Sequence, residues 1–81
     1  MTMKELKREI EKMNMWILNN LSFDEIGAIH KTKRELFRAK GYERDWLLST
    51  SRKKEIEDFL ECLINACYDN GIDLDEYYRK N

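Results

Sequence analysis

The sequence predicts an all-α protein, a small compact bundle of three main helices followed by a short C-terminal helical turn. The chain of 81 residues has no proline and only three glycines, which disfavours a turn-rich β fold. Its 42% hydrophobic and 38% charged residues suit helices that bury one stripe and expose charged faces. Apolar residues also recur at helical spacing in three separate segments. A chain of this length is expected to form a single domain, residues 1–81.

The first helix is predicted from Met3 to about Asn20. Its core residues follow a 4-3-4 spacing, which places them on one narrow face. These residues are Leu6, Ile10, Met13 and Ile17. Met15, Trp16 and Leu18 lie off this face, and we expect them to widen the apolar surface in the last two turns.

The second helix is predicted by a capping box, in which Ser22 is the N-cap and Glu25 follows three residues later. The helix is expected to run to about Lys40, with Gly41 as the residue that ends it. Lys33 interrupts the apolar stripe. Either its aliphatic stem crosses the core and its ammonium group points outward, or the core is thin at this position. The apolar positions of this helix are Phe23, Ile26, Ile29, His30, Leu36 and Phe37.

The third helix is predicted from about Arg52 to Asn70, and it has the widest apolar face of the three. It is therefore expected to form the centre of the core. Asp73 is a candidate cap for the final turn, Leu74 to Arg79. The candidate N-caps of the third helix are Ser49, Thr50 and Ser51, and its apolar residues are Ile56, Phe59, Leu60, Leu63, Ile64, Ala66, Cys67 and Tyr68.

The sequence predicts no enzyme active site, metal site or cofactor site. His30 is the only histidine, and we interpret it as a residue packed at the edge of the core. Cys62 and Cys67 are five residues apart with no C-x-x-C pattern, and we interpret them as buried thiols in a reducing compartment. No signal-peptide core or membrane-spanning run is present, so we expect a cytoplasmic protein without a membrane partner.

The charge is distributed unevenly although the net charge is only −1. The segment from Lys31 to Arg44 contains six basic and two acidic residues, whereas the segment from Glu55 to Glu76 contains eight acidic residues and no basic one. We interpret this separation first as internal pairing between packed helices. The alternative is that the separated charges steer a partner.

A protein-interaction module is the function that the sequence favours. An inter-helix segment of about ten residues follows Gly41 and combines tyrosine, arginine and tryptophan, the residue types that dominate binding hot spots. Three further basic residues are expected to line the outer face of the second helix and to steer the partner. Trp46 could instead close the core. The predicted partner-binding residues are Tyr42, Arg44, Trp46, Lys31, Arg34 and Arg38.

A short helical chain without catalytic motifs fits a stoichiometric regulator or inhibitor of a larger protein or nucleoprotein, a class common among phage and mobile-element proteins. The alternative is a nucleic-acid-binding accessory protein that uses the basic face of the second helix. The connection of about ten residues is too long for a helix-turn-helix. A third possibility is a structural or self-associating subunit, such as a homodimer formed through the seam of the first helix.

Overall fold

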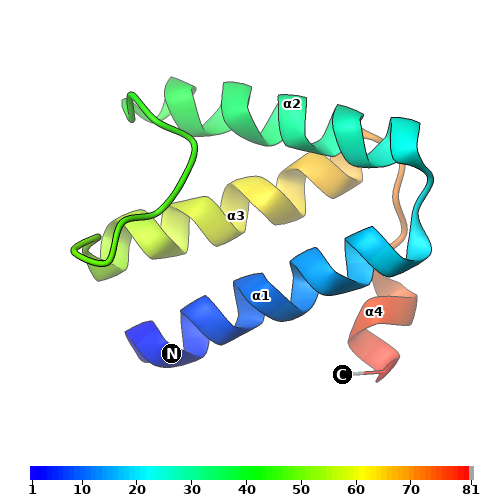
Figure 1. Cartoon of the computed structure of the whole chain (residues 1–81), viewed down its shortest axis with the longest axis horizontal. Helices are drawn as coiled ribbons and strands as arrows, with labels where there is room; N and C mark the ends of the chain where they lie inside the picture. Colours follow the sequence, from blue (N-terminus) through cyan, green and yellow to red (C-terminus); the bar gives the residue numbers. More distant parts are fainter. Residues whose placement is uncertain (81) are drawn as a thin grey trace.

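The computed structural model describes residues 1–80, and all of its regular elements are helices (Figure 1). They are α1 (Met3–Asn20), α2 (Phe23–Ala39), α3 (Lys53–Asp69) and the short α4 (Asp75–Lys80). In Figure 1, α3 lies between α1 and α2, and it packs against both. The predicted all-α class, three main helices and short terminal helix are therefore confirmed. The last residue of the predicted domain, 81, lies outside the described part of the chain.

The predicted core face of α1 is confirmed, because Leu6, Ile10, Met13 and Ile17 are all buried. The helix begins at a second capping box, in which the Thr2 hydroxyl accepts a hydrogen bond from the Glu5 amide and the Glu5 carboxylate accepts one from the Thr2 amide. This box was not predicted, although its T-x-x-E pattern is visible in the sequence.

Of the three residues expected to widen the apolar surface in the last two turns of α1, only one packs against the core. Trp16 packs against the core, but Met15 and Leu18 are each 56% exposed. Nine residues at about 100° each place Met15 opposite Leu6 on the helix. No other element covers that side of α1, so both side chains face solvent.

The second capping box is confirmed, with Ser22 and Glu25 exchanging both backbone-to-side-chain hydrogen bonds. The chain leaves α2 at Gly41, whose φ of 103° is open to glycine but strained for other residues. Ile29 and Phe37 are fully buried. Phe23 was predicted to belong to the same stripe, but it is 90% exposed because it lies about 120° around the helix from Ile29.

Lys33 lies inside the bundle and is only 8% exposed. Its stem crosses the core, as one of the two interpretations predicted. Its Nζ atom lies 4.5 Å from the centre of the Phe59 ring, in the geometry of a cation–π contact.

The central position of α3 is confirmed by its eight buried residues, but the prediction of its cap is wrong. Arg52 occupies the N-cap position and its side chain makes no capping hydrogen bond. Ser51 is buried one residue earlier, where its hydroxyl accepts a hydrogen bond from the Leu48 amide at 2.8 Å and donates one to Glu55 at 2.5 Å. Ser51 therefore stabilises the preceding turn instead of capping α3.

The chain after α3 folds back to close the end of the bundle. Asp73, two residues before the start of α4, accepts a hydrogen bond from the Asp75 amide at 2.8 Å, so it satisfies the first amide of the helix, which begins one residue later than predicted. Ile72, Leu74 and Tyr77 are buried, and the last of these joins α4 to α1. Across residues 1–80, no helix has both the length and the apolarity needed to cross a bilayer.

Candidate functional site

The connector, residues 40–52, loops from the end of α2 to the start of α3 (Figure 1). It holds three of the residues predicted to bind a partner: Tyr42, Arg44 and Trp46. The structure gives them different environments, because two of them bond to α3 and the third faces solvent.

Tyr42 is held by its ring and by its hydroxyl. The ring stacks on Phe37 of α2, with 4.2 Å between centroids and 8° between planes, and the hydroxyl donates a hydrogen bond of 2.7 Å to Asp58 of α3. This bond lowers the pKa of Asp58 and raises the pKa of Tyr42 to about 12. Lys54 also pairs with the buried Asp58 carboxylate, at 3.1 Å. Tyr42 thus fixes the first part of the connector to both long helices.

Arg44 is bound in the same way to the first turn of α3. Its Nη2 atom donates to both carboxylate oxygens of Glu55, at 3.1 and 2.9 Å. Glu55 also accepts the hydrogen bond from the buried Ser51. The Glu55 carboxylate therefore holds two separated points of the connector. Because the surrounding chain shields this carboxylate from water, its hydrogen bonds are stronger than those of a solvent-exposed ion pair.

Trp46 differs from its neighbours because it is 58% exposed. The residue before it, Asp45, accepts a hydrogen bond of 2.9 Å from Arg34 Nε on α2, and the residue after it, Leu47, packs against the core. The backbone is therefore held on both sides of an indole ring that faces solvent. The alternative in which Trp46 closes the core is wrong.

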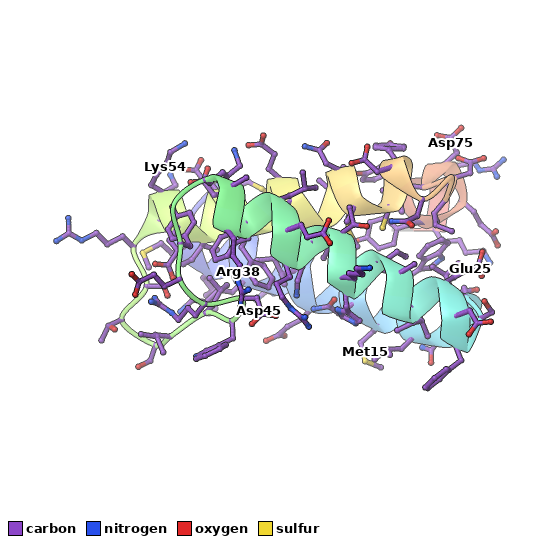
Figure 2. The ribbon with its side chains drawn as sticks, turned by 90° about the horizontal axis from the view of Figure 1, so that it is seen from above. Met15, Glu25, Arg38, Asp45, Lys54 and Asp75 are labelled. Atoms are coloured by element: carbon purple, nitrogen blue, oxygen red, sulfur yellow. The ribbon has the colours of Figure 1, made fainter. Side chains whose placement is uncertain are left out.

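Within the described part of the chain, only one of the three residues on the basic face of α2 (Lys31, Arg34 and Arg38) forms an ion pair. Arg34 pairs with Asp45, whereas Lys31 and Arg38 are exposed and lie beyond ion-pair distance of every carboxylate among residues 1–80. Figure 2 shows Asp45 on the same long side of the molecule as Met15, with Lys54 and Asp75 on the opposite side.

The predicted internal pairing of the basic segment with α3 is confirmed at two positions. Lys40 lies 3.4 Å from Glu61 and Arg44 lies 2.9 Å from Glu55.

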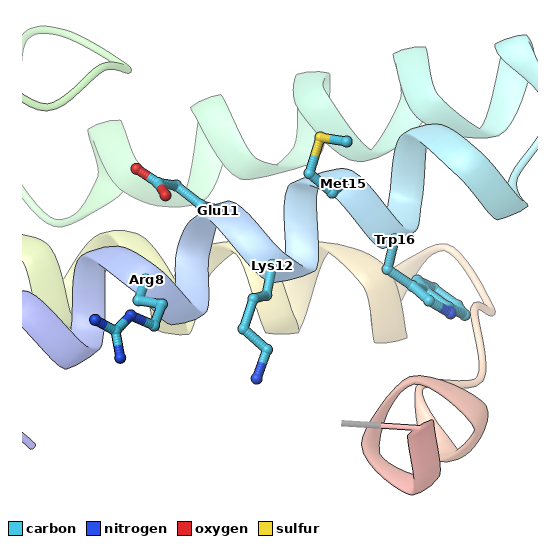
Figure 3. A pocket seen from close by; sticks show the side chains of 5 residues that line it. All are labelled: Arg8, Glu11, Lys12, Met15 and Trp16. Carbon is cyan, nitrogen blue, oxygen red and sulfur yellow. The ribbon is translucent and has the colours of Figure 1, made fainter.

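A shallow depression on α1 has no arrangement suited to catalysis. Its lining residues all come from one helix, and Figure 3 shows their side chains pointing in different directions. Polar groups therefore do not converge on one point, as they do in an active site. Among residues 1–80, no group of three or more histidine, cysteine, aspartate or glutamate side chains could hold a metal ion. The lining residues are Arg8, Glu11, Lys12, Met15 and Trp16.

The two cysteines and the single histidine do not have the surroundings that activate a catalytic nucleophile or base. Cys62 and Cys67 are buried as free thiols, and burial raises the pKa of Cys67 to about 11, so this thiol stays protonated near neutral pH. His30 is half-buried, and desolvation together with Lys33 and Arg34 lowers its pKa.

The fold and the connector define a small all-α bundle that presents one solvent-facing tryptophan from a fixed loop. Comparison of the chain with protein-family models, with curated proteins and with solved structures finds no match.

The Tyr42→Phe variant is expected to lose about 1–3 kcal/mol of unfolding free energy, because the buried Asp58 carboxylate loses a hydrogen-bond donor. The stack on Phe37 is retained. Urea unfolding followed by circular dichroism measures the loss, and Tyr68→Phe on the exposed surface of α3 is the matched control. Equal stability of Tyr42→Phe and the parent protein would show that the bond contributes nothing.

Stability is expected to fall as the pH drops below about 6.5, the model-compound pKa of histidine. The folded-state pKa of His30 is lowered, so the unfolded chain takes up this proton first and is favoured by acid. The folded-state pKa values of Asp45 and Asp58 are also lowered, which adds a second loss below about pH 4. Urea midpoints across the pH range test this, and His30→Gln should remove only the first loss. A loss of stability between about pH 6.5 and pH 4 that persists in His30→Gln would contradict the assignment of the first loss to His30.

Proposed function

We propose that this protein is a small non-enzymatic interaction module that binds a larger protein or nucleoprotein and regulates or inhibits it stoichiometrically. The observation that carries the proposal is the exposed Trp46 on a connector that is bonded to α2 and α3. Tryptophan is enriched among the residues that contribute most to binding energy at protein interfaces. The exposed indole ring of Trp46, on a fixed loop, is therefore a strong candidate for such a hot-spot residue.

The fixed connector lowers the cost of binding through Trp46. Association normally orders flexible loops and side chains at the interface, and this ordering opposes binding. Here Asp45 and Leu47 already hold the backbone on either side of the ring. Covering the exposed part of the indole would remove on the order of 100 Å² from water, which is worth roughly 3 kcal/mol.

The six predicted partner-binding residues divide into two roles under this proposal. Trp46 provides the central contact, while the exposed cations Lys31 and Arg38 attract acidic groups on the partner and raise the association rate. The other three residues, Tyr42, Arg44 and Arg34, act by holding the connector in place.

The finer parts of the proposal rest on the sequence. Inhibition as the mode of action, and a phage or mobile-element setting, follow from the small size of the chain. The cytoplasm is the proposed compartment, because Cys62 and Cys67 are both buried as free thiols.

The test is affinity capture from an extract of the source organism, followed by titration of the purified partner. Parent protein, Trp46→Ala and Tyr68→Ala are compared, because Tyr68 is about equally exposed but lies at the far end of α3. A partner that binds in a 1:1 ratio, is lost with Trp46→Ala and is kept with Tyr68→Ala supports the proposal. A partner bound equally by all three proteins rejects Trp46 as the contact.

Nucleic-acid binding is the second candidate, favoured by the exposed cations Lys31, Arg38, Arg52 and Lys53. Internal pairing of Arg34, among other basic residues, weakens this candidate. Binding to mixed-sequence DNA and RNA should be measured at two salt concentrations. A steep loss of affinity with salt would support phosphate contacts, and no binding at low salt would eliminate them.

Sedimentation over a range of concentrations tests the homodimer alternative.

A further inference from the structure

Exposed apolar side chains gather on the side of α1 and α2 that borders the connector, which we call the open face. Of the nine large hydrophobic side chains that are exposed among residues 1–80, five belong to it. Single apolar residues on a surface need no explanation, whereas a group of them beside charged residues marks an interaction site. The apolar residues of the open face are Met15, Leu18, Phe23, Trp46 and Leu48.

On α1, the open face is a row of side chains that begins beside the connector. Lys7 and Glu11 line a shallow depression together with Leu48. Met15 and Leu18 follow Glu11 by four and seven residues, so they continue the row along the same side of the helix. Figure 3 shows Glu11 and Met15 pointing from α1 in the direction of α2.

On α2, the open face is marked by Arg34, which bonds to Asp45 of the connector. Phe23 and Gly27 precede Arg34 by eleven and seven residues, and Arg38 follows it by four. These three positions therefore lie within about 40° of Arg34 around the helix. The open face thus has one apolar cluster where α1 meets α2 and a second one on the connector.

Gly27 interrupts the row on α2, although glycine destabilises the interior of a helix. Its backbone conformation does not require glycine, because only Gly41 and Gly71 have positive φ among residues 1–80. Packing does not require it either, since a Cβ atom added at Gly27 would meet no side chain and no other element within 4 Å. The missing side chain leaves this part of α2 open to close approach from outside the molecule.

The charges of the open face favour an acidic partner. Lys31 and Arg38 lie seven residues apart on one line of α2, beyond ion-pair distance of every carboxylate among residues 1–80. A symmetric dimer brings the same patch of two copies together, so these cations would oppose it. Acidic groups on a different protein would be attracted by them.

The architecture favours a helix as the docked segment. An extended peptide needs a strand edge to pair with, and the regular elements of residues 1–80 are all helices. Leu18 lies eleven residues beyond Lys7, which is about 16 Å along α1. Three turns of a partner helix cover the same length, and amphipathic helices bind through apolar anchors at such spacing.

We propose that the open face is the docking surface for an amphipathic helix of the partner. The apolar stripe of that helix covers Leu18, Phe23 and Trp46, and its glutamate or aspartate side chains lie beside Lys31 and Arg38. This inference rests on the proposed function and names the chemistry of the partner.

The probes are two designed helical peptides, each as long as α1, 18 residues, with leucines at i, i+4, i+7 and i+11. One carries glutamates beside the leucine stripe, and the other carries lysines. NMR shift mapping at low salt should place the acidic peptide on Leu18, Phe23, Gly27 and Trp46. Its dissociation constant should be at least about tenfold lower than that of the basic peptide.

Three outcomes of the peptide titration would overturn the inference. The first is absence of binding by the acidic peptide, or shifts confined to other surfaces. The second is equal or tighter binding of the basic peptide. The third is a different occupant: a mixed-sequence DNA duplex that binds the open face more tightly than the acidic peptide, or shifts on this face that depend on protein concentration alone, which would identify a second copy.

Gly27→Gln and Phe23→Ala separate docking from folding. Glutamine favours helix more than glycine does, so Gly27→Gln should unfold at an equal or higher urea concentration and yet bind the acidic peptide about tenfold more weakly. Phe23→Ala should weaken binding by a similar factor. The matched controls, which should not change binding, are Ala39→Gln at the exposed end of α2 and Tyr68→Ala on α3. Unchanged binding by either test variant would overturn the inference, and Phe23→Ala alone decides if Gly27→Gln does not fold.

The captured partner separates this inference from the proposed function. A partner that needs Trp46 but tolerates Gly27→Gln and Phe23→Ala would leave the proposed function intact and overturn the docking surface. Absence of any Trp46-dependent partner would reject the proposed function, whereas the peptide titration reports on the open face by itself.

Discussion

Tyr77→Ala is expected to lower the free energy of unfolding by about 3–5 kcal/mol, the range for removing a buried aromatic ring. Tyr77 is fully buried and makes an edge contact with Trp16, with 5.8 Å between ring centroids. Its hydroxyl also donates a hydrogen bond of 2.9 Å to Glu9, so one side chain joins α4 to α1. A chain of this size has a total stability of roughly 4–12 kcal/mol, so the variant should lose a large fraction of its stability and unfold at a much lower urea concentration.

Urea unfolding followed by circular dichroism measures this effect. Tyr78→Ala is the neighbouring control, because Tyr78 is exposed and its loss should change stability by less than about 1 kcal/mol. Tyr77→Phe separates the ring from the hydroxyl and should lose about 1–3 kcal/mol, since Glu9 would lose its donor. If Tyr77→Ala unfolds at the same urea concentration as the parent protein, α4 does not dock on α1 as described.

Trp46→Ala is expected to weaken partner binding by about 30-fold or more, which corresponds to the hot-spot threshold of about 2 kcal/mol. Its unfolding free energy should change by less than about 1 kcal/mol, because the Trp46 side chain is 58% exposed. The dissociation constant for the captured partner, measured by calorimetry, tests the first part, and urea unfolding tests the second.

Two variants separate the contact made by Trp46 from general surface effects. Tyr68→Ala removes a comparably exposed aromatic ring at the far end of α3 and should leave affinity unchanged. Arg38→Glu reverses a free charge on α2 and should mainly slow association, with a smaller effect at high salt. If Trp46→Ala is unfolded, the ring is part of the core and the hot-spot proposal fails.

The helices could be predicted well because their signals are local. The Ser22 capping box, the left-handed position at Gly41 and the 4-3-4 seam of α1 each depend on residues within about three helical turns of one another. The exposure of Phe23 and Met15 could not be predicted equally well. It depends on which side of a helix another element covers, and that is decided by packing between segments far apart in the sequence.

The connector was identified by its aromatic residues, but their roles could not be read from sequence. Tyr42, Arg44 and Trp46 all belong to residue types that form hot spots. Only the fold shows that Asp58 and Glu55, sixteen and eleven residues away, bind the first two and leave Trp46 exposed. Lys33 was visible in the sequence as an interruption of the apolar stripe. Its contact with Phe59 is a tertiary feature that spacing within α2 does not contain.

The most direct test of the central claim is the fluorescence of Trp46 in a Trp16→Phe background, which leaves one tryptophan in the chain. In the free protein, the account predicts emission typical of a solvent-exposed indole, ready quenching by acrylamide, and high anisotropy from a ring on a fixed connector. On addition of the partner, the emission should shift to shorter wavelength and the quenching should fall. A buried, unquenched emission in the free protein, or a spectrum that the bound partner leaves unchanged, would contradict the account.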